Sequence, residues 1–339
     1  MGNTNTKKTM TDNPLLKQNP AFRFVRDNLG ILVGLLVMCL ILVIYDAFRG
    51  RSVFLTTNNI MNVLRQVATN LYIACGMTMI IILGGIDLSV GSIVGLSGCV
   101  TGGLIAFVNW PMPAAVLMGV LVGVASGAFN GLWVSKTTIP PFIVTLAMMN
   151  IARGAGYVYT GGQPIRIMSD SFNFIGSGYV FDVIPMPVIY LVIIVLISSY
   201  IMNRTKLGRH IYAVGGNPMA ALFSGIKNGH VKFFAYVFSG TMSGISGVVL
   251  ASRMFSGQPT AGQSFEMDAI AAVVLGGTSM SGGVGKIGGT VIGALIIGVL
   301  NNGLNLLNIN SFWQYIVKGV VILIAVYVDF LKKTRKGNK

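Results

Sequence analysis

Side chains that could act as acids, bases, nucleophiles or metal ligands are scarce in this sequence. Of its 339 residues, 9 are Asp or Glu, 2 are His and 3 are Cys. Both histidines, His210 and His230, lie in one polar stretch, so no apolar segment offers a histidine base beside a serine or a pair of histidine metal ligands. Glu266 and Asp268 are two residues apart, which places them on different sides of a helix. These patterns favour neither an enzyme nor a metal site, and they indicate no cofactor.

A glycine-rich run at residues 280–287, MSGGVGKI, is similar to the phosphate-binding loop of nucleotide hydrolases. That loop needs a glycine at its first position and a Ser or Thr after the lysine to bind magnesium. Met280 and Ile287 stand at those two positions. We therefore expect that this chain does not hydrolyse ATP.

One acid, Asp87, lies between two long apolar runs in the stretch LGGIDLSVGS at residues 83–92. Glycines in this stretch indicate a break between two helices, and Ser89 and Gly91 would open the second one. A carboxylate at that position can accept hydrogen bonds from the free N–H groups of a helix start. We predict that Asp87 caps this helix; the alternative is direct contact with a substrate.

Hydrogen-bonding side chains recur inside other apolar segments. Asn62, Gln66 and Asn70 are spaced by four residues, so they share one face of a helix. An arginine within an apolar segment usually faces the interior of a bundle or water. The candidates are Asn62, Gln66, Asn70, Asn150, Arg153, Asn301 and Asn302. Each could bind a polar substrate or bond one helix to another.

The composition is that of an integral membrane protein. Hydrophobic residues make up 53% of the chain and charged residues only 10%, against about 25% charged in soluble domains. The net charge of +15 comes from 24 basic and 9 acidic residues. Because the basic residues fall mainly in gaps between apolar runs, they indicate membrane orientation and no nucleic-acid binding.

A membrane-spanning helix needs about 20 mostly apolar residues. Ten segments approach this criterion, and the eighth and ninth are short and interrupted by glycine, so eight spans with a re-entrant pair are the alternative. The segments are 29–48, 63–83, 88–107, 113–134, 142–159, 183–202, 231–251, 267–280, 287–300 and 312–331.

The distribution of Lys and Arg predicts which side each loop occupies. With ten spans and a cytoplasmic N-terminus, the N-terminal tail 1–28, Lys136, the loop 203–232, Lys286 and the C-terminal tail 332–339 lie inside. These regions hold 17 of the 24 basic residues, so both termini are expected in the cytoplasm. The membrane domain is expected to cover residues 29–331.

Glycines in the fourth segment are spaced by four residues, at Gly119, Gly123, Gly127 and Gly131. Such a stripe of small residues lets two helix backbones approach closely in a membrane. We predict a tight helix–helix contact along this face.

The loop 203–232 is the longest polar stretch between spans and contains five basic residues and no acid. Within it, Asn217 suits a helix N-cap, Pro218 suits the first helical position, and Gly225 suits the left-handed residue after a helix end. A helix this short is marginal alone. It either lies on lipid headgroups or docks on another protein.

Three long segments resemble the permease subunits of ribose-type ATP-binding-cassette importers. They are GMTMIIILGGIDLSVGSIVGLSG at 76–98, LGRHIYAVGGNPMAALFSGI at 207–226 and MDAIAAVVLGGTSMSGGVGKIGGTVIGALIIGVLNNGLNLL at 267–307. The similarity runs from about residue 55 to the C-terminus. The first segment holds three glycines, an acid and a serine that look like a family hallmark: Gly84, Gly85, Asp87, Ser89 and Gly91.

This resemblance implies an all-α permease of the type II importer class in the inner membrane of a bacterium. Its implied partners are a cytoplasmic ATPase, a periplasmic sugar-binding protein and a second permease copy. The loop residues that the family places against the ATPase are Gly216, Asn217, Ala220, Ala221, Ser224 and Gly225. The polar candidates inside the spans would line the path of a monosaccharide. A secondary carrier driven by an ion gradient is the alternative function.

Overall fold

The computed structural model describes residues 29–50 and 52–337, and they form a helical bundle. The predicted tail 1–28, Arg51 and residues 338–339 lie outside the described residues. The helices are α3 (Leu29–Phe48), α4 (Thr57–Ile82), α5 (Val90–Ala106), α6 (Met112–Lys136), α7 (Pro141–Thr160), α8 (Asp170–Ser177), α9 (Met186–Arg204), α10 (Lys206–Gly216), α11 (Pro218–Phe223), α12 (Asn228–Arg253), α13 (Phe265–Leu275), α14 (Ile287–Leu306) and α15 (Ser311–Gly337).

Each predicted segment overlaps one helix, but three helices near the C-terminus differ from the predicted bounds. The ninth segment is not shortened: α14 has 20 residues and includes Asn301 and Asn302, which were expected to follow it. The eighth segment is a helix of only 11 residues, because α13 ends before Gly276 and Gly277, and Gly277 has φ +83°. Helix α15 continues to Gly337, into the predicted tail.

Five of the described helices are long and apolar enough to cross a membrane. They are α3, α6, α9, α12 and α14. Helix α3 has no fully buried residue: one face, with Leu35, Met38 and Leu42, is partly buried against the bundle, and the apolar side chains of the remaining surface are exposed. Exposed apolar faces of this kind are expected where lipid covers the protein.

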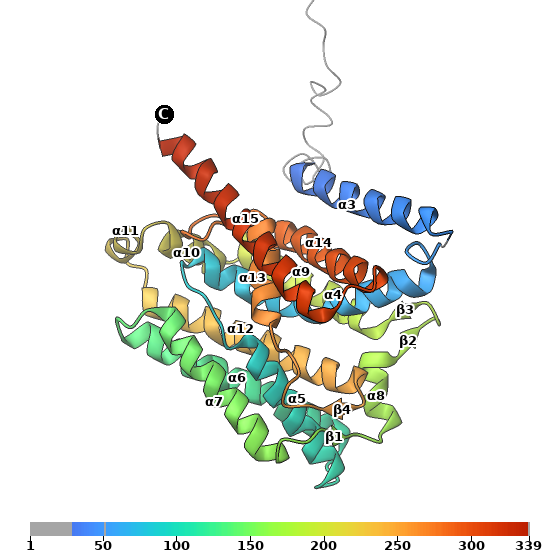
Figure 1. Cartoon of the computed structure of the whole chain (residues 1–339). Coiled ribbons are helices and arrows are strands. Elements are labelled where there is room, and N and C mark those ends of the chain that lie inside the picture. The colour runs from blue at the N-terminus through green and yellow to red at the C-terminus, as the bar shows by residue number, and fades with distance from the viewer. Residues whose placement is uncertain (1–28, 51, 338–339) are drawn as a thin grey trace, which may run out of the picture.

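Four strands of two residues each add to the helical fold. Strand β1 (Ile165–Arg166) pairs antiparallel with β4 (Ser256–Gly257), and β2 (Tyr179–Val180) pairs with β3 (Ile184–Pro185). With α8 they form one end of the bundle, and α10 and α11 lie at the opposite end (Figure 1). The start of α3 and the end of α15 point toward the end that carries α10 and α11 (Figure 1).

Helix α12 lies at the centre, between α6 and α4 (Figure 1). The predicted glycine stripe of α6 packs on it, with Gly123 against Gly240 and Gly244. A Cβ atom added to Gly123 would lie 2.7 Å from the Cα atom of Gly244, closer than real side chains come. The two backbones are therefore in direct contact, as the spacing predicts.

Candidate substrate pathway and coupling surface

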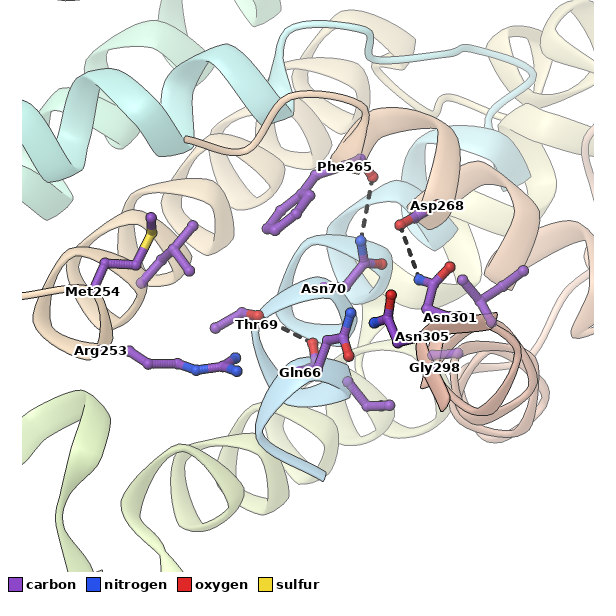
Figure 2. A pocket seen from close by; sticks show the side chains of 14 residues that line it. Gln66, Thr69, Asn70, Arg253, Met254, Phe265, Asp268, Gly298, Asn301 and Asn305 are labelled. Carbon is purple, nitrogen blue, oxygen red and sulfur yellow. Dashed lines mark hydrogen bonds between the residues drawn. The ribbon is translucent and has the colours of Figure 1, made fainter. Parts of the chain in front are cut away.

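A cavity of about 420 Å³ lies between α4, α12, α13 and α14. Figure 2 shows four side-chain amides gathered around it, two from α4 and two from α14. The residues that line it are Gln66, Val67, Thr69, Asn70, Leu250, Arg253, Met254, Phe265, Asp268, Ala294, Ile297, Gly298, Asn301 and Asn305. Three predicted pathway residues thus meet in one place, Gln66 and Asn70 of α4 and Asn301 of α14, although Asn301 is more than 200 positions away from the other two in the sequence.

Helix α13 accepts hydrogen bonds from two amides of this cavity. The Nδ2 atom of Asn70 donates to the carbonyl oxygen of Phe265 at 3.5 Å, and the Nδ2 atom of Asn301 donates to Oδ2 of Asp268, also at 3.5 Å. The side-chain oxygen of Asn301 is buried and has no hydrogen-bond partner among the described residues. A ligand that donates a hydrogen bond to this buried oxygen would offset the desolvation cost that the oxygen carries without a partner.

An ion pair lies at the edge of the cavity, with Asp268 in its wall and Lys318 behind it. Nζ of Lys318, on α15, lies 3.0 Å from Oδ2 of Asp268, on α13. The same carboxylate lines a smaller neighbouring cavity of about 230 Å³, together with Gln66, Asn301 and Lys318. Asp268 therefore joins α13, α14 and α15 through one oxygen atom.

Asn150 and Arg153 line a different cavity, of about 290 Å³, at α7. The guanidinium of Arg153 donates to the carbonyl oxygens of Pro259 and Ala261, the second at 3.0 Å. These bonds hold the segment between β4 and α13. The structure thus separates these two candidates from the amides of α4 and α14.

Asn62 and Asn302 have other surroundings. Asn62 is exposed and does not line the 420 Å³ cavity. Asn302 and Asn59 exchange amide hydrogen bonds of 2.8 and 3.1 Å, which tie α14 to α4. This geometry is that of a bond between helices, the alternative considered for each polar candidate.

Asp87 is fully buried in the break between α4 and α5, as its flanking glycines indicate. The prediction that Asp87 caps α5 is wrong. The N-cap residue of α5 is Ser89, and no side chain makes a cap hydrogen bond there. Instead Oδ1 of Asp87 accepts from the N–H and hydroxyl of Ser89, and Oδ2 accepts from the hydroxyl of Ser239 on α12. Asn130 of α6 donates to Ser89, so Asp87 ties the break to α6 and α12.

The neighbouring glycines of this break have separate local roles. Gly84 has φ +79°, a conformation that favours glycine. At Gly85 a side chain would meet the hydroxyl of Tyr236 at 2.7 Å, and at Gly91 it would meet the backbone of Gly262. Close packing explains two of the glycines and backbone conformation explains the third.

The polar loop 203–232 folds into two helices, of which only α11 was expected. Oδ1 of Asn217 accepts from the N–H groups of Met219 and Ala220 at 3.0 Å each, and Gly225 has φ +81°. The predicted cap, first-turn proline and left-handed glycine are confirmed. Helix α10, before it, begins with the hydroxyl of Thr205 as its N-cap.

Helix α11 presents apolar side chains outward. Met219, Leu222 and Phe223 are 58, 52 and 83% exposed, while Ala221 is buried against the rest of the chain. The hydroxyl of Ser224 donates to the carbonyl oxygen of Ala220 within the helix. Beside α11, a side chain at Gly216 would meet open space.

Sequence reasoning missed Arg253, Asp268 and Lys318 as neighbours of the pathway. Asp268 was considered only beside Glu266 as a pair of acids, and Lys318 lies within the predicted span 312–331. Their one signal was a charge within an apolar segment, which usually finds a partner in the bundle. No cluster of three or more His, Cys, Asp or Glu side chains able to hold a metal occurs in residues 29–50 and 52–337.

Comparisons with known proteins agree with this architecture. The family model "Branched-chain amino acid transport system / permease component" matches residues 59–326. Ribose import permease protein RbsC of Bacillus subtilis (strain 168) is 49% identical over 310 residues, which cover 91% of this chain and 94% of that protein. RbsC of Escherichia coli (strain K12) is 45% identical over 284 residues, covering 83% and 88%.

A further relative is named as a permease of xylose transport. Xylose transport system permease protein XylH of Escherichia coli (strain K12) is 33% identical over 369 residues, covering 91% of this chain and 94% of that protein. No solved structure matches the chain. From the extent of the family match and the identity to these relatives, this multi-pass membrane chain belongs to the family of transport-system permease components.

Proposed function

We propose that this chain is the membrane permease subunit of an ATP-driven importer and that it conducts ribose. The observation that carries the proposal is the cavity lined by Gln66, Asn70, Asn301 and Asn305, found in a chain 49% identical to a ribose import permease. Transport, not catalysis, is the activity expected of such a subunit.

Neutral amides suit a monosaccharide because each offers both donors and an acceptor to hydroxyl groups that need both. Few aromatic groups line the cavity, and Phe265 alone among its lining residues carries a ring. Such a wall binds a sugar weakly, which is sufficient when a periplasmic binding protein delivers it. Weak binding also lets the sugar leave on the inner side.

The ATPase that drives transport would dock on α11. Its exposed Met219, Leu222 and Phe223 form an apolar surface that a cytoplasmic ATPase would cover. The capped backbone from Asn217 to Gly225 gives this surface a defined shape. We assign the contact with the ATPase to the exposed positions Gly216, Asn217, Ala220, Ser224 and Gly225. Ala221, which the resemblance also implied, is buried against the rest of the chain and so supports α11 from its inner side.

The bundle is oriented so that α10 and α11 face the cytoplasm. The start of α3 and the end of α15 lie toward the same end of the bundle (Figure 1), which supports cytoplasmic termini and an even number of crossings; the count of about ten rests on the apolar segments of the sequence. The basic tails and the acid-free loop 203–232 agree with this orientation. We place the protein in the inner membrane of a bacterium, paired with a second copy of itself.

Reconstitution in liposomes tests the proposal against an ion-driven carrier. The chain assembled with its ATPase and ribose-loaded binding protein is expected to take up labelled ribose only when ATP is present. A matched sample without the ATPase receives a proton or sodium gradient. Uptake by that lone chain would contradict the importer and support the carrier.

A further inference from the structure

Three backbone segments meet directly beneath the proposed ATPase contact. They are the last turn of α10, the end of α4, and the glycine-rich segment 276–286 between α13 and α14. The N–H of Gly283 donates to the carbonyl oxygen of Ile82 at 2.8 Å. The hydroxyl of Tyr212, on α10, donates to the carbonyl oxygen of Gly285 at 2.8 Å. We name this contact the α10 joint.

Glycine is required in the α10 joint because no side chain fits. A Cβ atom at Gly215 would overlap the carbonyl oxygen of Ile82 and lie 2.9 Å from the N atom of Gly283. A Cβ atom at Gly283 would lie 2.9 Å from the Cα atom of Gly216, and Gly283 has φ +73°. The three segments therefore touch backbone to backbone, with nothing flexible between them.

The segments of the α10 joint lead to the cavity on one side and to α11 on the other. Helix α4 carries Gln66 and Asn70, α13 carries Asp268, and α14 carries Asn301 and Asn305. Helix α10 continues through Asn217 into α11. Ile211 and Val214, on the inner face of α10, are fully buried, so α10 cannot shift without moving its neighbours.

We propose that Tyr212, Gly215 and Gly283 are positioning residues that transmit movement of α11 to the helices lining the cavity. The inference rests on the proposed function, because it needs an ATPase that moves α11. Close-packed interiors compress little and pass displacements on to their neighbours. A displacement of α10 would thus reach the ends of α4 and α13 together and change the separation of the cavity walls.

The experiment measures ribose taken up per ATP hydrolysed by the reconstituted complex. Tyr212→Phe removes one hydroxyl, and the ratio is expected to fall about two- to tenfold, the effect of one hydrogen bond. Gly215→Ala forces α10 away from Ile82, and the ratio is expected to fall further. Tyr200→Phe, at an exposed tyrosine of α9, and Gly154→Ala, at a glycine of α7 with open space around it, are the matched controls.

The ratio separates transmission from mere stability. A residue that only stabilises the fold would lower the amount of complex, its ATPase rate and its uptake in proportion, and leave the ratio unchanged. An unchanged ratio in Tyr212→Phe overturns the inference even if Gly215→Ala does not assemble. Absence of ATP-dependent uptake in the unmodified complex would instead overturn the proposed function, and this inference with it.

Discussion

The ion pair between Lys318 and Asp268 gives a quantitative test of how α15 is held. Nζ and Oδ2 are 3.0 Å apart, and the two side chains are 18% and 9% exposed. Removing one partner of a buried pair costs about 3–5 kcal/mol, because the remaining charge stays buried and unpaired. Since this pair is not completely buried, we expect Lys318→Met to lower the free energy of unfolding by about 3 kcal/mol, the lower end of that range.

A double-mutant cycle isolates the pair. Asp268→Asn leaves the lysine unpaired but keeps an acceptor oxygen for Asn301, so its cost should be smaller than that of Lys318→Met. The combination Asp268→Asn with Lys318→Met removes both charges, and it should be more stable than Lys318→Met alone.

Unfolding by sodium dodecyl sulfate in mixed micelles, followed by tryptophan fluorescence, measures these free energies. Costs that add in the double variant, with no coupling between the two sites, would show that the pair is not formed in the membrane. The account of α15 as a helix pinned to the cavity wall would then be wrong.

Three further substitutions test local features. Asn217→Ala removes the cap of α11 and should weaken ATPase binding about fivefold, equivalent to the ~1 kcal/mol of a lost cap, whereas Asn217→Asp should bind normally in the same pull-down titration. Gly123→Ala should destabilise the bundle by about 1–3 kcal/mol through overpacking against α12, whereas Gly154→Ala should leave detergent-solubilised stability unchanged or slightly raised. Asp87→Asn should retain most transport, because the amide oxygen can still accept from Ser89 and the amide nitrogen can donate to the Ser239 hydroxyl. Asp87→Leu should lose transport. Equal loss of transport in both variants, with normal amounts of protein in the membrane, would point to a need for the charge itself.

Features with a local cause were accessible from the sequence. Asn217, Pro218 and Gly225 act on backbone groups within a few positions of themselves, so residue type and spacing were sufficient to predict α11. The stripe through Gly123 also follows from helical spacing alone, and the helix against which it packs did not need to be known.

Features that depend on distant segments were not accessible. Lys318 and Asp268 are 50 positions apart, and no pattern in the sequence states that α15 lies beside α13. The pathway candidates looked equivalent because each was a polar group in an apolar segment, yet packing sends Asn70 and Asn150 to different cavities. Asp87 was expected to cap the nearest helix, and its bond to Ser239 of α12 arises from tertiary packing.

The central claim is that ribose passes between α4 and α14. A photoreactive ribose derivative, delivered by the binding protein during ATP hydrolysis and competed with excess ribose, would mark its path in the assembled complex. Peptide mapping is expected to find the label on the helix segments that carry Gln66, Asn70, Asn301 and Asn305. Competable label on the segment of α7 around Asn150 and Arg153, with none on α4 or α14, would contradict the account.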